Sequence, residues 1–185
     1  MSDHRVTSVK IVNNSGINFA SVGVVHKYSD NYKNSYLWEN VANGVTTGAD
    51  MTVDYNTGFM TTGTDWWYVM ATAEDGTKYI TDPSNATWLL DIVNKGISGV
   101  VEPMATGIVA GSAFAGQAEV AAPVAAAKFL LEAVVNEESV EGFKEFMLRK
   151  EDETSPVSIT LTSSEVIFQA PSGTASTPLK ASGHR

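Results

Sequence analysis

Short β-like segments, each ended by a turn signal, fill the first 82 residues and limit the folds open to this chain. The segments are rich in β-branched and aromatic residues, and turns rich in Gly, Asn, Asp or Ser follow at intervals of about 8–12 residues. The tetrad Glu74-Asp75-Gly76-Thr77 predicts a hairpin. Short strands at this spacing are typical of a β-sandwich or a barrel. We predict strands over residues 6–13, 19–28, 36–41, 51–55, 65–73 and 78–82.

The middle of the chain has helical rather than strand-like patterning. A helix can start at Ser84 or Asn85, directly after a proline that ends the preceding strand. A second helix is expected from near Pro123, and a third over residues 140–150, where apolar residues recur at helical spacing. We therefore expect a helical insertion over about residues 84–150.

Strand patterning returns near the C-terminus. Residues 157–161 alternate, and residues 165–170 can pair with them as a hairpin that joins the N-terminal sheet. From Pro171 the chain is rich in Ser, Thr, Gly and Pro, so a flexible tail is expected over residues 171–185. The predicted fold is mainly β: one β-sandwich domain over residues 1–170, with an Ala/Gly-rich helical insertion before a C-terminal β-hairpin.

Charge and composition exclude several classes of function. The chain has 21 Asp and Glu against 12 Lys and Arg, and a net charge of −9 argues against nucleic-acid binding. The absence of cysteine excludes thiolate metal sites and a cysteine nucleophile. No catalytic motif and no pair of His at metal-ligand spacing occurs, so we expect a non-enzymatic protein with no catalytic residues, no metal and no cofactor.

Two chemical alternatives stay open. His26 can act as the base of a hydrolase, although a single His on a strand is more often packed or hydrogen-bonded. Asp30, Asp50 and Asp54 can meet around a cation, although the loop after Asp30 does not match a calcium loop.

An aromatic set in the β half supplies the ligand-binding candidates. On a strand, Trp66 and Trp67 must point to opposite faces, so a one-sided core takes only one of them. Tyr and Trp surfaces serve glycan stacking, lipid-headgroup contact and protein interfaces alike. We favour the alternative in which both faces of the sheet are covered, one by the second sheet and one by the helical segment. The candidates are Tyr28, Tyr32, Tyr36, Trp38, Tyr55, Trp66, Trp67 and Tyr68.

A nearly uncharged stretch over residues 103–127 is long enough to cross a membrane. Its only charged residue is Glu119, but its Ala, Gly and Val content makes insertion marginal. We expect a packed helical hairpin or a glycine-rich linker, and a segment that inserts only after release is the alternative. The membrane-insertion candidates are Gly107, Gly111, Phe114 and Gly116.

Location and partners follow from the same patterns. The N-terminus is polar, with no apolar run and no small-residue cleavage site, so a cytoplasmic location is expected and leaderless release stays open. The expected partner is a small molecule, a glycan, a lipid headgroup or a protein. Membrane contact and oligomerisation also stay open.

Five segments carry a family resemblance: residues 25–34 (VHKYSDNYKN), 53–59 (VDYNTGF), 65–67 (DWW), 79–83 (YITDP) and 142–152 (GFKEFMLRKED). Together they resemble the Udp domain family, named after nematode proteins up-regulated in an insulin-receptor mutant and also found in fungi. The resemblance spans most of the chain. It implies a small β-rich protein linked to stress or lifespan, and it implies no catalytic residues.

A shorter stretch, residues 54–56 followed by 66–67, is similar to actinoporin-like and fungal fruit-body lectin sandwiches, which bind phosphocholine headgroups or glycans. Function does not follow from such a likeness of fold. We expect a non-enzymatic binding or interaction module, stress- or defence-related, that uses the aromatic loops 29–36 and 56–65. The alternative is a membrane-active protein of pore-forming type with residues 103–127 as its mobile segment. A hydrolase that uses His26 ranks third.

Overall fold

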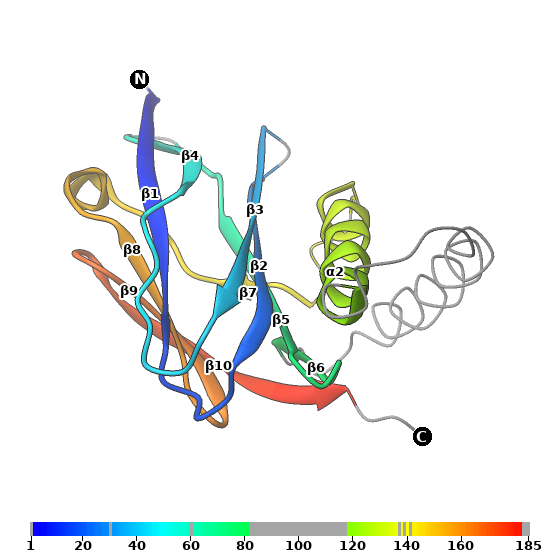
Figure 1. Ribbon diagram of the computed structural model, residues 1–185. Coiled ribbons are helices and arrows are strands. Elements are labelled where there is room, and N and C mark those ends of the chain that lie inside the picture. Colours follow the sequence, from blue (N-terminus) through cyan, green and yellow to red (C-terminus); the bar gives the residue numbers. More distant parts are fainter. Residues whose placement is uncertain are drawn as a thin grey trace.

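The computed structural model describes residues 2–29, 31–59, 61–81, 118–136, 138, 140 and 142–182, with side chains at all of these except 118–123 and 182. The described residues are mostly strands, with one long helix beside them (Figure 1). The strands are β1 (Asp3–Asn13), β2 (Phe19–Tyr28), β3 (Tyr32–Val41), β4 (Met51–Thr57), β5 (Asp65–Ala73), β6 (Lys78–Thr81), β7 (Lys144–Glu145), β8 (Val157–Leu161), β9 (Glu165–Ala170) and β10 (Gly173–Ser182). The helices are α2 (Ala118–Asn136) and the short 3₁₀ helix η1 (Lys150–Thr154).

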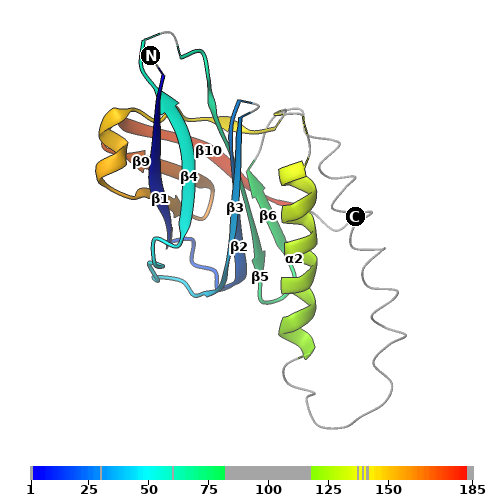
Figure 2. The same ribbon diagram turned by 90° about the horizontal axis from the view of Figure 1, so that it is seen from above.

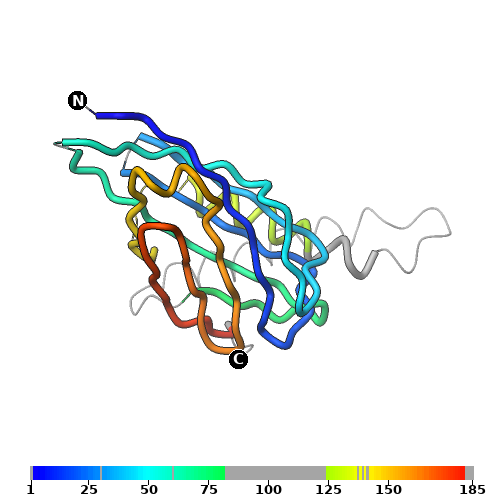
Figure 3. Tube along the Cα trace, turned by 90° about the vertical axis from the view of Figure 1, so that its left-hand side faces the viewer, coloured from blue at the N-terminus to red at the C-terminus, as the bar shows by residue number. Residues whose placement is uncertain are grey.

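One continuous strand order, β3-β2-β5-β6-β10-β9-β8-β1-β4, builds two facing sheets, and β7 pairs with β5 outside it. β10 belongs to both sheets, because residues 173–178 pair with β9 and residues 179–182 pair with β6. Strands that switch sheets in this way form the corners of β-sandwiches. β8 pairs in parallel with β1, so the C-terminal hairpin joins the N-terminal sheet as expected (Figure 3).

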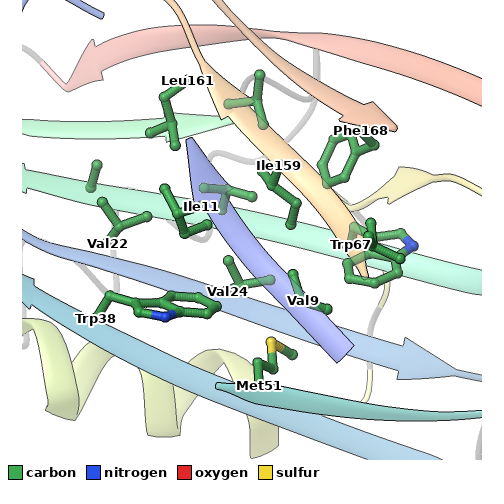
Figure 4. Close-up of a cluster of buried hydrophobic side chains, with 14 of the residues drawn as sticks. Val9, Ile11, Val22, Val24, Trp38, Met51, Trp67, Ile159, Leu161 and Phe168 are labelled. Atoms are coloured by element: carbon green, nitrogen blue, oxygen red, sulfur yellow. The ribbon is translucent and has the colours of Figure 1, made fainter. Parts of the chain in front are cut away.

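The main hydrophobic core lies between the two facing sheets (Figure 4). It forms because alternate side chains of each strand point inward, as Val9 and Ile11 do on β1 while Lys10 and Val12 stay half-exposed. Both sheets contribute, with Val24 and Trp67 from one and Ile159 and Phe168 from the other. The prediction of a mainly β, sandwich-like fold is therefore confirmed.

The helix α2 packs against the outer face of the sheet that contains β2 and β5 (Figure 2). Leu130, Leu131 and Val134 of the helix form a second apolar cluster with sheet residues such as Val25 and Tyr68. Gly23 permits this close approach, because a Cβ there would lie 3.0 Å from the side chain of Leu131. Both faces of this sheet are thus covered where α2 lies, as the favoured alternative predicted.

The predicted helix over residues 140–150 does not form at residue 140 or over residues 142–149, and Lys150 begins η1. Phe143, Phe146 and Leu148 are buried, whereas Met147, which the helical pattern placed inside, is 39% exposed. Asp65 overrides the local pattern: its carbonyl accepts the N–H of Phe146 at 3.1 Å, and its Oδ2 accepts the N–H of Leu148 at 2.9 Å. The backbone bonds that a helix needs are therefore made to β5 instead.

The predicted flexible tail over residues 171–185 is also wrong for the part described. Gly173–Ser182 form β10, which pairs on both sides and buries Leu179 in the main core. A composition rich in Ser, Thr and Pro is compatible with a strand here. Pro178 lies at the point where the pairing of β10 changes from β9 to β6. The first helix, predicted from Ser84, lies outside the described residues.

The remaining predicted strands are confirmed, with small differences in where they begin and end. β3 begins at Tyr32 rather than at residue 36, so the loop before it is shorter than expected. The predicted hairpin at residues 74–77 joins β5 to β6, with the N–H of Ala73 donating to the carbonyl of Thr77 at 2.8 Å. Gly76 takes a positive φ of 86° there, a conformation that costs glycine little.

Candidate functional site

Most of the aromatic candidates are buried in the structure, and the others are half-buried or exposed. Tyr32 and Trp66 are half-buried, and only Tyr36, at 38%, is exposed. As predicted, Trp66 and Trp67 face opposite ways, one packed against the helix-side cluster and the other inside the sandwich. The buried candidates are Tyr28, Trp38, Tyr55, Trp67 and Tyr68.

The membrane-insertion candidates Gly107, Gly111, Phe114 and Gly116 lie outside the described residues. Among the helices that the structure describes, none is long and apolar enough to span a bilayer.

Two loops meet at one end of the sandwich. Ser29, after β2, donates its N–H to the carbonyl of Thr64 at 3.0 Å, and Thr64 donates its N–H to Ser29 Oγ at 3.1 Å. Gly63 lies so close that a Cβ there would stand 2.1 Å from the Tyr28 hydroxyl oxygen. Phe59 is 84% exposed on the second loop. We call this region, residues 29, 31–34, 56–59 and 61–64, the loop end.

A chain of five polar side chains runs from the surface near the loop end into the core. His4 Nε2 lies 2.9 Å from Asp54 Oδ1, and Asn34 Nδ2 donates to Asp54 Oδ2 at 3.0 Å. His26 Nδ1 lies 3.3 Å from Asn34 Oδ1, and His26 Nε2 lies 2.8 Å from Asp65 Oδ1. We call these residues, which come from β1, β4, β3, β2 and β5, the polar chain. It connects an exposed histidine with a fully buried His–Asp pair.

Both ring nitrogens of His26 face oxygen atoms. The amide of Asn34 is fixed, because its Oδ1 accepts the N–H of Asp54 at 3.1 Å while its Nδ2 donates to the Asp54 carboxylate. His26 is fully buried and Asp65 is buried beside it. This geometry offers no ring nitrogen to a substrate hydroxyl, so it does not favour His26 as the base of a hydrolase.

The carboxylate of Asp65 also acts on a neighbouring phenol. Burial raises the pKa of the Tyr28 hydroxyl, and the negative charges of Asp65 and of an ionised Tyr32 add to the rise, while a hydrogen bond with the backbone of Gly63 opposes it. Tyr28 therefore stays neutral beside the buried carboxylate.

The possible cation site does not form as a cluster in the part of the chain described. Asp50 accepts the indole N–H of Trp38 at 3.1 Å, and Asp54 belongs to the polar chain. Asp30 lies outside the described residues, and no group of three His, Asp or Glu side chains gathers among those described.

A cavity of about 340 Å³ opens beside the loop end, on the side of the sheet that α2 covers. It is lined by Lys27, Ser29, Lys33 and Glu138. Lys27 is almost fully buried, and its Nζ lies 4.6 Å from the ring centre of Phe143. The sequence pattern did not predict this site, because a strand that begins at residue 36 leaves Lys33 in a loop, whereas β3 begins at Tyr32 and pairs Lys33 with Lys27.

The fold and the site together define a β-sandwich protein with a helix on one outer face, a loop end with polar and aromatic side chains, and a small charged cavity beside it. The chain belongs to the family described as "Up-Regulated in long-lived daf-2", whose model matches residues 3–179. The suspected Udp domain membership is thereby confirmed. No curated protein matches the chain.

Proposed function

We propose that this protein is a non-enzymatic binding module that holds a polyhydroxylated ligand, such as a glycan, at the loop end. The observation that carries the proposal is the surface where the ring of Tyr32 lies beside the His4–Asp54 pair, with the exposed Phe59 on the second loop of the loop end. The rings of His4 and Tyr32 are 5.3 Å apart, which places an aromatic face beside a carboxylate. Binding sites for small polar ligands combine these elements: apolar rings for contact and a few fixed polar groups for orientation.

The rigidity of this surface supports the proposal. Asn34 holds the Asp54 carboxylate, and Ser29 ties the two loops together through Thr64. Groups held in place before binding lose little conformational entropy when a ligand arrives. A role in stress or defence is part of the proposal, and the family's description, which concerns up-regulation, is consistent with it.

The proposal is tested by probing labelled protein against an array of neutral glycans, with Tyr32→Ala and Phe59→Ser as variants. We expect the wild type to bind at least one glycan and each variant to bind it about tenfold more weakly, because stacking contacts with aromatic rings are lost. Val45→Ser is the matched control, since Val45 is an exposed apolar residue that bonds to Asn13 at the other end of β1. Absence of any glycan binding, or equal binding by all variants, would overturn the proposal.

Vesicle sedimentation and dye leakage separate this function from the membrane-active alternative. The binding module is expected to leave phosphatidylcholine vesicles intact. Leakage caused by the wild type and abolished in Phe59→Ser would instead favour a membrane-active protein, with the exposed Phe59 as a contact residue.

A further inference from the structure

We propose that the side chain of His4 occupies the ligand's place beside the loop end in the free protein, and that a ligand binds by displacing it. The inference concerns the regulation of the proposed binding site. It rests on the proposed function, because it takes the surface around Tyr32 and Asp54 as the place of the ligand. Its consequence is a competitor within the chain, which lowers the affinity of the site for any outside ligand.

Both described contacts of the His4 side chain are contacts that a sugar would also make. Its Nε2 lies 2.9 Å from Asp54 Oδ1, and its ring centre lies 5.3 Å from that of Tyr32, with the two ring planes tilted by 40°. An ionised carboxylate only accepts hydrogen bonds, so Nε2 carries a proton and donates it. A sugar ring likewise places one face against an aromatic ring and donates a hydroxyl proton to a fixed acceptor.

The two carboxylate oxygens of Asp54 differ in how firmly their partners are held. Oδ2 accepts Nδ2 of Asn34 at 3.0 Å, and Asn34 is fixed because its own Oδ1 accepts the N–H of Asp54 at 3.1 Å. Oδ1 instead accepts His4, whose side chain is 51% exposed. Exposed pairs of this kind contribute little free energy, because water competes for both groups. A ligand can therefore take over Oδ1 while Asn34 keeps the carboxylate in place.

The exchange needs only the rotation of one side chain. The backbone of His4 is held in β1, where it pairs with Asn56 of β4. Rotation of the imidazole into water frees Asp54 Oδ1 and uncovers the half-buried ring of Tyr32, and both strands keep their pairing. Exposed side chains change rotamer within nanoseconds, so His4 does not slow binding. The measured association constant is the intrinsic one multiplied by the fraction of molecules in which His4 is turned away.

The first experiment uses free imidazole as the probe, because imidazole is the ring of His4 without its tether. It is added to the ¹⁵N-labelled full chain at fixed pH and ionic strength, and amide signals are followed by NMR. We expect the signals of Tyr32 and Asp54 to shift about threefold more in His4→Ala than in the wild type, because a tethered ring has a high effective concentration. His4 is exposed, so the variant should fold, and its amide spectrum shows whether it does.

Thr52→Ala is the matched control, because Thr52 is exposed on the same strand as Asp54. It should respond to imidazole as the wild type does. Equal shifts of Tyr32 and Asp54 in the wild type and in His4→Ala, or no shift in either protein, would overturn the inference, since the place of His4 would then not accept a ring that carries a donor.

The second experiment measures the affinity for the neutral glycan that binds best on the array. We expect His4→Ala to bind it about threefold more tightly than the wild type, and Thr52→Ala to bind it equally well. Weaker binding by His4→Ala would show that His4 contacts the ligand, which overturns the inference and leaves the proposed function intact. If no glycan binds while imidazole still distinguishes His4→Ala from the wild type, the proposed function fails and the occupation of the site by His4 stands.

Discussion

Tyr55 and Tyr68 each bury a phenol, but their hydroxyl groups have different surroundings. Tyr55 donates its hydroxyl to the carbonyl of Arg149 at 3.1 Å. The hydroxyl of Tyr68 has no hydrogen-bond partner in the described part of the chain, although the side chain is fully buried between the sheet and α2. A buried polar group without a partner lowers stability, whereas a paired one contributes to it.

Removing each hydroxyl should therefore change stability in opposite directions. We expect Tyr68→Phe to leave the free energy of unfolding unchanged or raise it by about 1 kcal/mol, because an unpaired hydroxyl is removed from an apolar layer. Tyr55→Phe should lower it by about 1 kcal/mol, because the carbonyl of Arg149 loses a donor. Urea unfolding at neutral pH measures both values. A loss of stability in Tyr68→Phe equal to that in Tyr55→Phe would contradict this account.

The raised pKa values of these two tyrosines predict that the protein loses stability at alkaline pH. Burial raises the pKa of Tyr55 and of Tyr68, and the nearby Asp152 carboxylate adds to the rise at Tyr55. A raised pKa in the folded state gives a contribution to stability that is complete below the unfolded value of about 10. It is lost as the pH rises toward the folded value. We expect the urea midpoint to stay constant up to about pH 9 and to fall above about pH 10. The fall should be smaller in Tyr68→Phe.

At the scale of single elements, the sequence predicts strands best where they alternate and end in a strong turn. Residues 19–28, 65–73, 157–161 and 165–170 were predicted with the limits that β2, β5, β8 and β9 have. The helical prediction for residues 140–150 failed because the partners of this segment lie on β5, far away in sequence. Asp65 and Leu148 are 83 residues apart, and no local pattern reveals that bond.

The same limit applies to the candidate site. The aromatic candidates were found because tyrosine and tryptophan are conspicuous in a sequence, but their burial depends on how the two sheets and α2 pack together, which no local pattern reveals. The polar chain was not predicted because its five members come from five strands, and the two that stood out, His26 and Asp54, were candidates for two different sites. The cavity was missed because Glu138 approaches Lys27 only in the folded chain.

The strand β10 offers a test at the element scale. Leu179 is 7% exposed and packs in the main core, whereas Ser176 on the same strand is exposed. We expect Leu179→Ala to lower the free energy of unfolding by about 2–4 kcal/mol, as for other buried leucines. Ser176→Ala is the control and should change it by less than about 0.5 kcal/mol. Equal, negligible effects in urea unfolding would mean that residues 173–182 behave as the tail first expected.

At the scale of the whole molecule, side chains close the sandwich where its strand order ends. β3 and β4 stand at the two ends of the order and lie next to each other. Over the described residues they are joined through side chains, by Asn34 with Asp54 and by Trp38 with Asp50. Asn34 also faces His26, so the closure is linked to the buried pair.

Asn34→Ala tests this closure. We expect it to lower the free energy of unfolding by about 1–3 kcal/mol, because His26, the N–H of Asp54 and the Asp54 carboxylate all lose a partner. Hydrogen exchange should accelerate in β4 while β8 and β9 keep their protection. Asn31→Ala, at an exposed position of the same hairpin, is the control. Uniform acceleration over all strands would show that the closure is not a separate unit.

Closure by side chains has a consequence for solubility. A sheet edge presents unpaired backbone groups that recruit other chains, and proteins shield such edges by covering or charging them. Here β3 and β4 shield each other, so separating them would expose two edges at once without unfolding the core. A protein whose closure is weakened should therefore begin to aggregate below its melting temperature, and in a concentration-dependent way.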